Sequence, residues 1–142
     1  MANTIKLEII TPSRLFYRGE VEMVIVPTLF GEEGFMANHS WATKLLDVGE
    51  MAIQEPGGGG FKIAAIAGGF IDVKDSIVVY ADHAEWQEEL DKKRAEADKQ
   101  AVEEWLAQHR EEDSMDVRRA EVMLKKAISR MRVAEGGRRA GH

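Results

Sequence analysis

Residues 67–95 read AGGFIDVKDSIVVYADHAEWQEELDKKRA, and the character of the sequence changes within them. Two runs rich in β-branched residues, 70–73 and 77–81, flank a short polar turn at 74–76, a pattern typical of a β-hairpin. The charged run from Glu85 onward, which includes Ala and Leu, predicts a helix. The stretch therefore indicates where a β-rich part of the chain ends and an α-helical part begins.

The composition is that of a globular protein, since 44% of the 142 residues are hydrophobic and 31% are charged. The net charge of −6 argues against general affinity for nucleic acid, because binding to phosphates requires clustered Lys and Arg. The absence of cysteine excludes disulfides, thiol nucleophiles and thiolate metal sites. No apolar run approaches the roughly 20 residues that span a bilayer. The N-terminus also lacks the basic and apolar segments of a signal peptide.

Charged residues are distributed unevenly along the chain. They make up 17 of the first 84 residues but 27 of the last 58, and the change coincides with the start of the predicted helix. We therefore expect a β-sandwich domain at residues 1–84, a helical hairpin at 85–135 and a disordered tail at 136–142.

The first part shows the period-two alternation of half-buried strands, for example at Ile5, Leu7 and Ile9. Turn residues recur at close spacing, and Pro56 with the four glycines after it predicts a flexible turn between two paired strands. The segment 41–46 fits either a strand or one helical turn. Many short strands joined by such turns indicate an antiparallel β-sandwich or barrel. No βαβ unit is visible, which argues against a parallel nucleotide-binding sheet.

From Glu85 onward the apolar residues recur at helical spacing, so two helices are predicted. The first carries Trp86, Leu90, Ala97, Ala101 and Trp105. The second, capped by Ser114 or Asp116, carries Val117, Ala120, Leu124, Ala127, Met131 and Ala134. Because alanine buries little apolar area, this hairpin should open or detach at modest cost. The predicted fold class is α+β, with an N-terminal antiparallel β-sandwich followed by a C-terminal two-helix antiparallel hairpin.

The two predicted helices differ in charge. Residues 85–113 hold 5 Lys+Arg and 11 Asp+Glu, whereas residues 116–142 hold 8 and 3. An acidic helix and a basic helix attract each other, which would explain the pattern within the hairpin itself. The alternative is that the basic second helix also binds an acidic partner elsewhere.

No catalytic or metal-binding motif emerges from the sequence. The glycines at 57–60 lack the Lys and Ser/Thr of a phosphate-binding loop, and no Gly-x-Ser-x-Gly nucleophile turn occurs. Gly68-Gly69 indicates close backbone approach or a bulge rather than a ligand site. No metal site is expected, because no two of the histidines stand at ligand spacing on one predicted helix: His39, His83, His109 and His142. The chain is therefore not expected to be an enzyme on its own.

Asp91 and Arg94 form the most informative polar pair. They stand three residues apart, so they share a helix face and can form an ion pair. Arg94 also falls between Leu90 and Ala97 on the apolar stripe, where a guanidinium directed into a groove between helices would bind an anion. The simpler interpretation is the ion pair alone, with the arginine stem lying along the helix.

Short motifs in a characteristic order are spread along almost the whole chain. They are Val21-Glu22-Met23-Val24 after Gly19-Glu20, Gly31-Glu32-Glu33-Gly34 followed by Asn38-His39, residues 67–73, residues 78–82, residues 90–95, and Arg119-Ala120-Glu121 near Val133-Ala134-Glu135. In this order and spacing the chain resembles the epsilon subunit of the F-type (rotary) ATP synthase of bacteria. The family fold, a β-sandwich followed by a helical hairpin, agrees with the organisation predicted from the residues.

The resemblance implies a non-catalytic rotor subunit that requires no cofactor. Its sandwich would bind the gamma subunit and the membrane-embedded c-ring, and would help couple ion flow to ATP synthesis in the alpha/beta hexamer. The expected location is peripheral, at the cytoplasmic face of the bacterial plasma membrane. Glu32 and His39 match the family's ring-facing loop. That loop departs from the family pattern, because the Pro-Gly-His-Ala-Pro expected there is replaced by Ala37-Asn38-His39-Ser40-Trp41.

The resemblance also implies regulation by the helical hairpin. In the family the hairpin either folds onto the sandwich or extends toward the beta subunits, where it blocks ATP hydrolysis. At about 1.5 Å per residue, a second helix of about twenty residues reaches roughly 30 Å, long enough to enter the hexamer. The basic residues expected to contact the beta subunits are Arg118, Arg119, Lys125, Lys126 and Arg130.

In some bacterial members ATP binds the folded hairpin and holds it against the sandwich. The positions that match this site are Glu85, Asp91, Arg94, Lys126 and Arg130. Two arginines of the family are replaced, one by Ala101 and the other by Lys126. Because charge-assisted hydrogen bonds to phosphate are strong, their loss predicts weak regulatory ATP binding or none. The alternative function is a free-standing nucleotide-sensing module.

Overall fold

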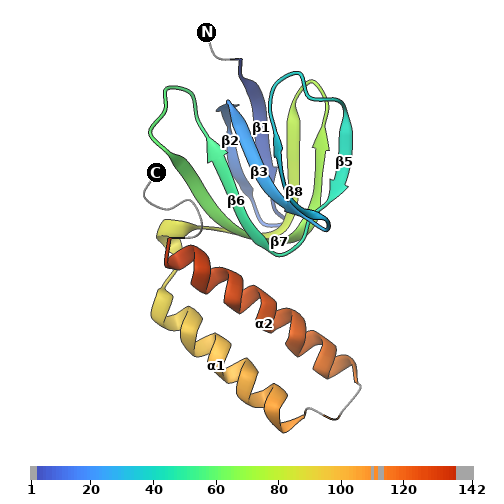
Figure 1. Ribbon diagram of the computed structural model, residues 1–142, viewed down its shortest axis with the longest axis vertical. Coiled ribbons are helices and arrows are strands. Elements are labelled where there is room, and N and C mark those ends of the chain that lie inside the picture. Colours follow the sequence, from blue (N-terminus) through green and yellow to red (C-terminus); the bar gives the residue numbers. More distant parts are fainter. Residues whose placement is uncertain (1–2, 110, 112–113, 137–142) are drawn as a thin grey trace.

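The computed structural model describes residues 3–109, 111 and 114–136. Within them, a β-rich part is followed by two helices (Figure 1). The strands are β1 (Ile5–Ile10), β2 (Leu15–Val21), β3 (Met23–Thr28), β4 (Gly31–Phe35), β5 (Ala42–Leu45), β6 (Gly49–Gln54), β7 (Phe61–Val73) and β8 (Ile77–Trp86). The helical elements are the 3-10 turn η1 (Gln87–Glu89), α1 (Lys92–Gln108) and α2 (Met115–Ala134).

The eight strands form one sheet in the order β2-β1-β8-β7-β6-β3-β4, with β5 added beside β7. The pairs are antiparallel except for β1 and β8, which run parallel. The 13-residue β7 pairs with β6 through its first half and with β5 through its second half. The sheet can therefore fold over on itself into two layers (Figure 1).

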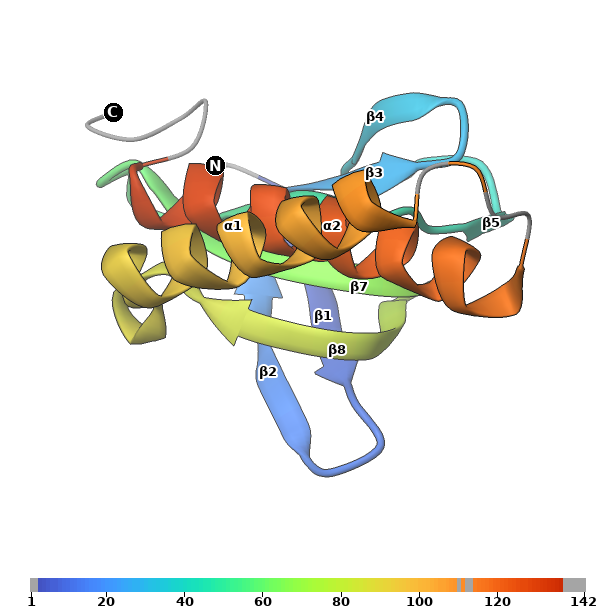
Figure 2. The ribbon, with the colours of Figure 1, turned by 90° about the horizontal axis from the view of Figure 1, so that it is seen from below.

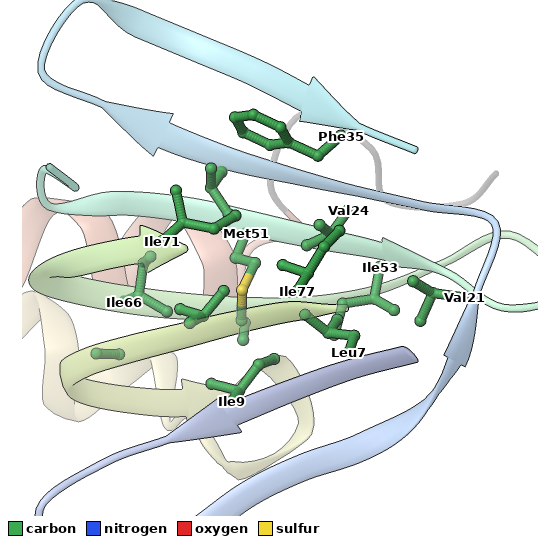
Figure 3. Packing of buried hydrophobic residues seen from close by; sticks show 14 of the residues in the cluster. Leu7, Ile9, Val21, Val24, Phe35, Met51, Ile53, Ile66, Ile71 and Ile77 are labelled. Carbon is green, nitrogen blue, oxygen red and sulfur yellow. The ribbon is translucent and has the colours of Figure 1, made fainter. Parts of the chain in front are cut away.

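The core lies between the two layers and is built from the inward positions of the strands. Leu7 and Ile9 of β1 and Met51 and Ile53 of β6 are fully buried, and side chains from β3, β7 and β8 converge on them (Figure 3). This confirms the alternation predicted for the first strand. None of the described residues of α1 or α2 belongs to this cluster. The sandwich therefore encloses its main core without the helices.

The middle of β7 requires glycine. Gly68 and Gly69 have φ values of 71° and 105°, which side chains rarely tolerate. A Cβ added to Gly69 would lie 1.8 Å from the carbonyl oxygen of Tyr80 on β8. The pairing of β7 with β8 keeps the same register on both sides of these glycines. The two residues therefore serve close backbone approach and not a bulge.

The prediction that a helix begins at Glu85 is wrong. Strand β8 continues through Glu85 to Trp86, and α1 begins only at Lys92. Trp86 stays in the sheet because it pairs with Ala64 and its ring stacks on Phe16, with the ring centroids 4.3 Å apart. Such tertiary contacts outweigh local helical preference.

The apolar stripe predicted for the first helix is also misplaced. Ala97 and Ala101 are exposed, whereas Ala95 is buried and Val102 and Leu106 are half-buried. The prediction counted the helical period from Trp86, which lies in a strand. The predicted stripe is therefore out of phase with the helix.

The second helix follows its prediction. Its N-cap is Ser114, whose Oγ accepts a hydrogen bond from the backbone N–H of Val117 at 3.2 Å. The predicted stripe is covered, with Val117, Ala120 and Ala127 buried and Leu124, Met131 and Ala134 half-buried. The helices lie side by side below the sandwich (Figures 1 and 2), which confirms the α+β fold class. Residues 137–142 of the predicted tail lie outside the described residues.

Candidate functional site

Two ion pairs join α2 to the sandwich. Arg130 Nε donates to Glu85 Oε1 on β8 at 2.7 Å. Lys125 Nζ donates to Asp47 Oδ1, in the loop before β6, also at 2.7 Å. The acidic partners come from segments far apart in the sequence, so the contact fixes α2 across two places on the sandwich.

A small apolar contact lies near these ion pairs. Val133 is 1% exposed and belongs to a buried cluster with Ile63 and Ala65 of β7. The side-chain amide of Gln87 donates to the backbone carbonyl of Val133 at 3.0 Å. A fully buried valine contributes only about 1.5–3 kcal/mol. This cluster therefore adds only a modest apolar contribution to the two ion pairs. Detachment of the hairpin stays a prediction.

Glu85 is the centre of this contact. Its Oε1 accepts from Arg130 and also lies 2.9 Å from His83 Nε2. Burial raises the pKa of Glu85, but hydrogen bonds and charge from Arg130 and His83 together leave that pKa below its usual value. The hydrogen bond from Lys125 likewise lowers the pKa of Asp47, against a smaller opposing effect of burial. Both carboxylates are therefore ionised at neutral pH and can hold α2.

Acidification is expected to release α2. Because the pKa values of Glu85 and Asp47 are lowered in the docked state, docking is favoured above their ordinary values of 4.5 and 3.8 and is lost as the pH falls through the lowered values. The chain has no cysteine, so dyes can be attached through Asp75→Cys on the sandwich and Glu121→Cys on α2. Energy transfer between the dyes should fall below about pH 4.

The control for this titration is Glu85→Gln combined with Asp47→Asn in the same labelled chain. Its energy transfer should already be reduced at pH 7 and should change little on acidification, because the two titrating carboxylates are gone. A wild-type chain whose energy transfer stays constant through this range would show that these ion pairs do not hold the helix.

The five residues predicted to bind ATP are only partly brought together. Glu85, Lys126 and Arg130 line one cavity of about 10 Å³ between α2 and the sandwich. That volume admits about one water molecule. Asp91 and Arg94 lie at the start of α1 and are not among the residues that line it. In this conformation the cavity is far too small for a nucleotide.

The ion pair predicted between Asp91 and Arg94 is not formed among the described residues. Asp91 is instead the N-cap of α1, and its Oδ1 accepts from the backbone N–H of Lys93 at 3.0 Å and of Arg94 at 3.3 Å. The Arg94 side chain is exposed, so its predicted direction into a groove between the helices is also wrong. Both errors arise because α1 begins at Lys92, which places Asp91 at the cap.

The five cations expected to contact the beta subunits fall into two groups. Lys125 and Arg130 are paired with the sandwich, and Lys126 is half-buried beside the small cavity. Arg118 and Arg119 are exposed on the N-terminal half of α2. Within the described residues, the basic side chains toward the C-terminal end of α2 therefore contact or border the sandwich, whereas Arg118 and Arg119 lie on the exposed surface of the helix.

Glu32 and His39, which match the family's ring-facing loop, lie in and after β4. Glu32 is exposed on β4, and His39 is half-buried, with its Nδ1 2.7 Å from the Ser40 carbonyl oxygen. Two large aromatic side chains nearby in the sequence are also exposed to solvent: Phe30 is 99% exposed and Trp41 is 67% exposed. Exposed aromatic side chains beside polar ones are typical of a protein contact.

Sequence reasoning missed an apolar row on the outer face of the sheet. Directly paired positions on β5, β7, β8, β1 and β2 carry Leu45, Phe70, Tyr80, Ile10 and Leu15. The first and last of these are 62% and 50% exposed, and the two aromatic rings stack with centroids 4.7 Å apart. The strand register brings these residues together from three separate parts of the chain, namely residues 10–15, residue 45 and residues 70–80. Such a row is a candidate protein-binding surface.

Among the described residues, no group of three or more His, Asp or Glu is placed to bind a metal ion. No helix in that part of the chain is both long and apolar enough to cross a membrane.

The sequence matches two family profiles. The profile described as "ATP synthase, Delta/Epsilon chain, beta-sandwich domain" matches residues 4–87, and the "long alpha-helix domain" matches residues 88–135. The ATP synthase epsilon chain of Desulforamulus reducens is 42% identical over 136 residues, covering 95% of this chain and 100% of that protein. The ATP synthase epsilon chain of Alkaliphilus metalliredigens is 46% identical over 111 residues, covering 78% and 81%.

A solved structure shares the fold. A chain in the cryo-EM structure of the Euglena gracilis mitochondrial ATP synthase, which includes OSCP, F1 and the c-ring, superposes with a TM-score of 0.77 at 23% identity. The superposition covers 89% of this chain and 78% of that chain. The family profiles, the epsilon-chain relatives and the order of sandwich and hairpin all agree, and the chain therefore belongs to the ATP synthase delta/epsilon family, as its motifs predicted.

Proposed function

We propose that this chain works as the epsilon subunit in the central stalk of a bacterial F-type ATP synthase. It would bind gamma and the c-ring, couple ion translocation to ATP synthesis, and restrain ATP hydrolysis through its C-terminal helices. The observation that carries the proposal is a sandwich with its own core beside a helix docked by few contacts. The subunit would sit peripherally at the cytoplasmic face of the plasma membrane, held there by its partners.

Gamma is proposed to dock on the apolar row of β5, β7, β8, β1 and β2. The stacked rings of Phe70 and Tyr80 stand at its centre, where aromatic anchors contribute most to a protein interface. The row crosses five hydrogen-bonded strands, so the side chains are held rigidly before binding. Little ordering entropy is then lost on association.

The c-ring contact is proposed at Glu32 and His39. Phe30 and Trp41 would add apolar area, because both rings are largely exposed. Trp41 stands where the family has proline, so this chain would rely on a large aromatic side chain at that edge of the contact.

The second helix is proposed as the brake on ATP hydrolysis. In the docked state Lys125 and Arg130 are held by Asp47 and Glu85. Release would free both cations to join the other basic side chains of α2 against acidic residues of the alpha/beta hexamer. Docking and inhibition are then mutually exclusive, because the same cations serve both.

ATP is proposed to have at most a weak regulatory role. The cavity between Glu85, Lys126 and Arg130 is about 10 Å³, so a nucleotide could enter only after Arg130 had left Glu85. Ala101 and Lys126 also replace two arginines of the family site. Calorimetry that measured micromolar affinity for ATP would contradict this proposal.

The brake is tested by ATP hydrolysis in an alpha/beta/gamma core complex. The whole chain should slow hydrolysis at least about fivefold. A chain that ends at Trp86 should bind the core without slowing it, because the main core cluster lies within the sandwich. Failure of either form to bind would contradict the rotor role, and equal inhibition by both forms would contradict the role of the helices.

A further inference from the structure

A groove of about 800 Å³ lies between α2 and the sandwich. Its sandwich wall is formed by the turn between β3 and β4 and by residues 47–50 at the start of β6, and its helix wall by side chains between residues 125 and 135. The positions that match the family's ATP site are not among its lining residues, so the groove is a separate feature. Its volume lies within the roughly 300–1,000 Å³ of clefts that bind small ligands, which is enough for a short peptide segment.

The groove is negatively charged. Its described lining residues include more carboxylates than cations, with a net charge of −2: Glu32, Asp47, Glu50 and Glu135 against Lys125 and Arg132. Opposite charges across a contact favour association, so the occupant should be basic. Leu29 and Ile128 also line the groove, and apolar surface of this kind suits the methylene stems of long basic side chains.

The described chain ends at the rim of this groove. Helix α2 ends at Ala134, and Gly136 has a φ of 119°, the left-handed conformation that turns a chain aside after a helix. The N–H of Gly136 donates to the carbonyl of Val133 at 3.0 Å. Gly136 is buried, and Glu135 lines the groove. Figure 1 shows this end of α2 as the end nearest the sandwich, so the residues that follow start beside the groove.

We infer that residues 137–142, Gly-Arg-Arg-Ala-Gly-His, bind in this groove as a strap that holds α2 on the sandwich. Arg138 and Arg139 supply the positive charge that the groove favours. Their guanidinium groups would lie against the carboxylates that line it, among them Glu50 on β6. A segment that binds its own chain begins at high effective concentration, so modest contacts are sufficient.

The length of the strap matches the groove. From Glu135 back to Lys125 the groove follows ten residues of α2, which is about 15 Å at about 1.5 Å per residue. Six extended residues span at most about 20 Å, so the strap can cover this distance. Because it would contact both walls, α2 could leave the sandwich only after the strap had been released. The inference rests on the proposed function only for this regulatory consequence.

The first test locates the strap in the isolated full chain by NMR. A nitroxide attached through Ala140→Cys should broaden the backbone amide signals of Thr28, Val48 and Glu50, which line the groove. Arg138→Glu with Arg139→Glu reverses the charge of the strap. This variant should reduce the broadening at least about twofold, because each exposed ion pair is worth up to about 1 kcal/mol.

The matched control is Lys93→Glu with Arg94→Glu on α1. It makes the same change in net charge, both side chains are exposed, and neither lines the groove. Broadening at the groove should stay at the wild-type level in this control, because the strap and its site are intact.

The second test measures docking of α2 by energy transfer between dyes at positions 75 and 121. It uses Glu85→Gln chains, in which docking is already weakened by loss of the pair with Arg130, so a further change is visible. A chain that ends at Gly136 should dock about threefold to tenfold more weakly than the same chain with residues 137–142.

The outcomes separate the strap from the proposed brake. Unchanged broadening after charge reversal, or unchanged docking in the shortened chain, would overturn the strap. Broadening in unlabelled chains mixed with nitroxide-labelled ones would place the segment in the groove of a second copy, and would also overturn it. Both tests use the isolated chain, so the hydrolysis assay still decides the brake when the strap fails. A strap that binds in a chain without inhibitory effect would overturn the brake alone.

Discussion

Replacing Gly69 with alanine is expected to lower the free energy of unfolding by about 4 kcal/mol. Gly69 has a φ of 105°, and its Cβ would lie 1.8 Å from the carbonyl oxygen of Tyr80. Neither strand can move away from the other without loss of hydrogen bonds, because β7 and β8 are both central strands of the sheet. Urea denaturation followed by tryptophan fluorescence measures the loss.

The matched control is Gly59→Ala. Gly59 also has a positive φ, 96°, but nothing lies within 4 Å of an added Cβ. This substitution carries only the backbone strain, which costs about 1–2 kcal/mol. Equal losses at the two positions would show that close approach to Tyr80 contributes nothing to the requirement for glycine.

Replacing Val133 with aspartate is expected to undock the helical hairpin at neutral pH. An ionised carboxylate buried beside Ile63 and Ala65 would cost more than the few contacts of α2 can offset, so the helix should leave the sandwich. Energy transfer between dyes at positions 75 and 121 should fall to the level of the undocked chain. Inhibition of ATP hydrolysis should begin faster, because Lys125 and Arg130 are released from their partners.

The control for this variant is Val133→Ala, which removes apolar contact without adding charge. It should weaken docking by about 1–2 kcal/mol and leave most molecules docked. Unfolding of the sandwich should be unchanged in both variants, since Val133 lies outside its main core. An aspartate variant that kept full energy transfer would show that Val133 does not anchor the hairpin.

The sequence predicted elements whose signals are local. The alternation at Ile5, Leu7 and Ile9 predicted the first strand, and the stripe from Val117 to Ala134 predicted α2. Each pattern is visible because one face of a single element is buried. The junction at Trp86 was not predictable in this way. Its conformation depends on Phe16, about seventy residues earlier in the chain, and no local periodicity records that contact.

The candidate site was predictable to a similar extent. The resemblance singled out Glu85 and Arg130, and the structure joins them at 2.7 Å. The resemblance could not indicate Asp47 as the partner of Lys125, because a single carboxylate in a loop carries no sequence signal. The apolar row was hidden for a different reason. Leu45, Phe70 and Tyr80 look like isolated surface residues until the strand register is known.

The parallel pairing of β1 with β8 also governs when the protein can fold during synthesis. β1 can pair with β2 early, but residues 7–10 find their other partners at residues 77–80, so this second pairing waits for nearly the entire sandwich to be made. Such a distant pairing slows folding, because a long loop must close before the contact forms. On the ribosome, the sheet can be completed only when the chain has emerged to about the point where the helices begin. The helical hairpin is therefore synthesised directly after the sandwich first becomes able to complete its sheet and bind the hairpin.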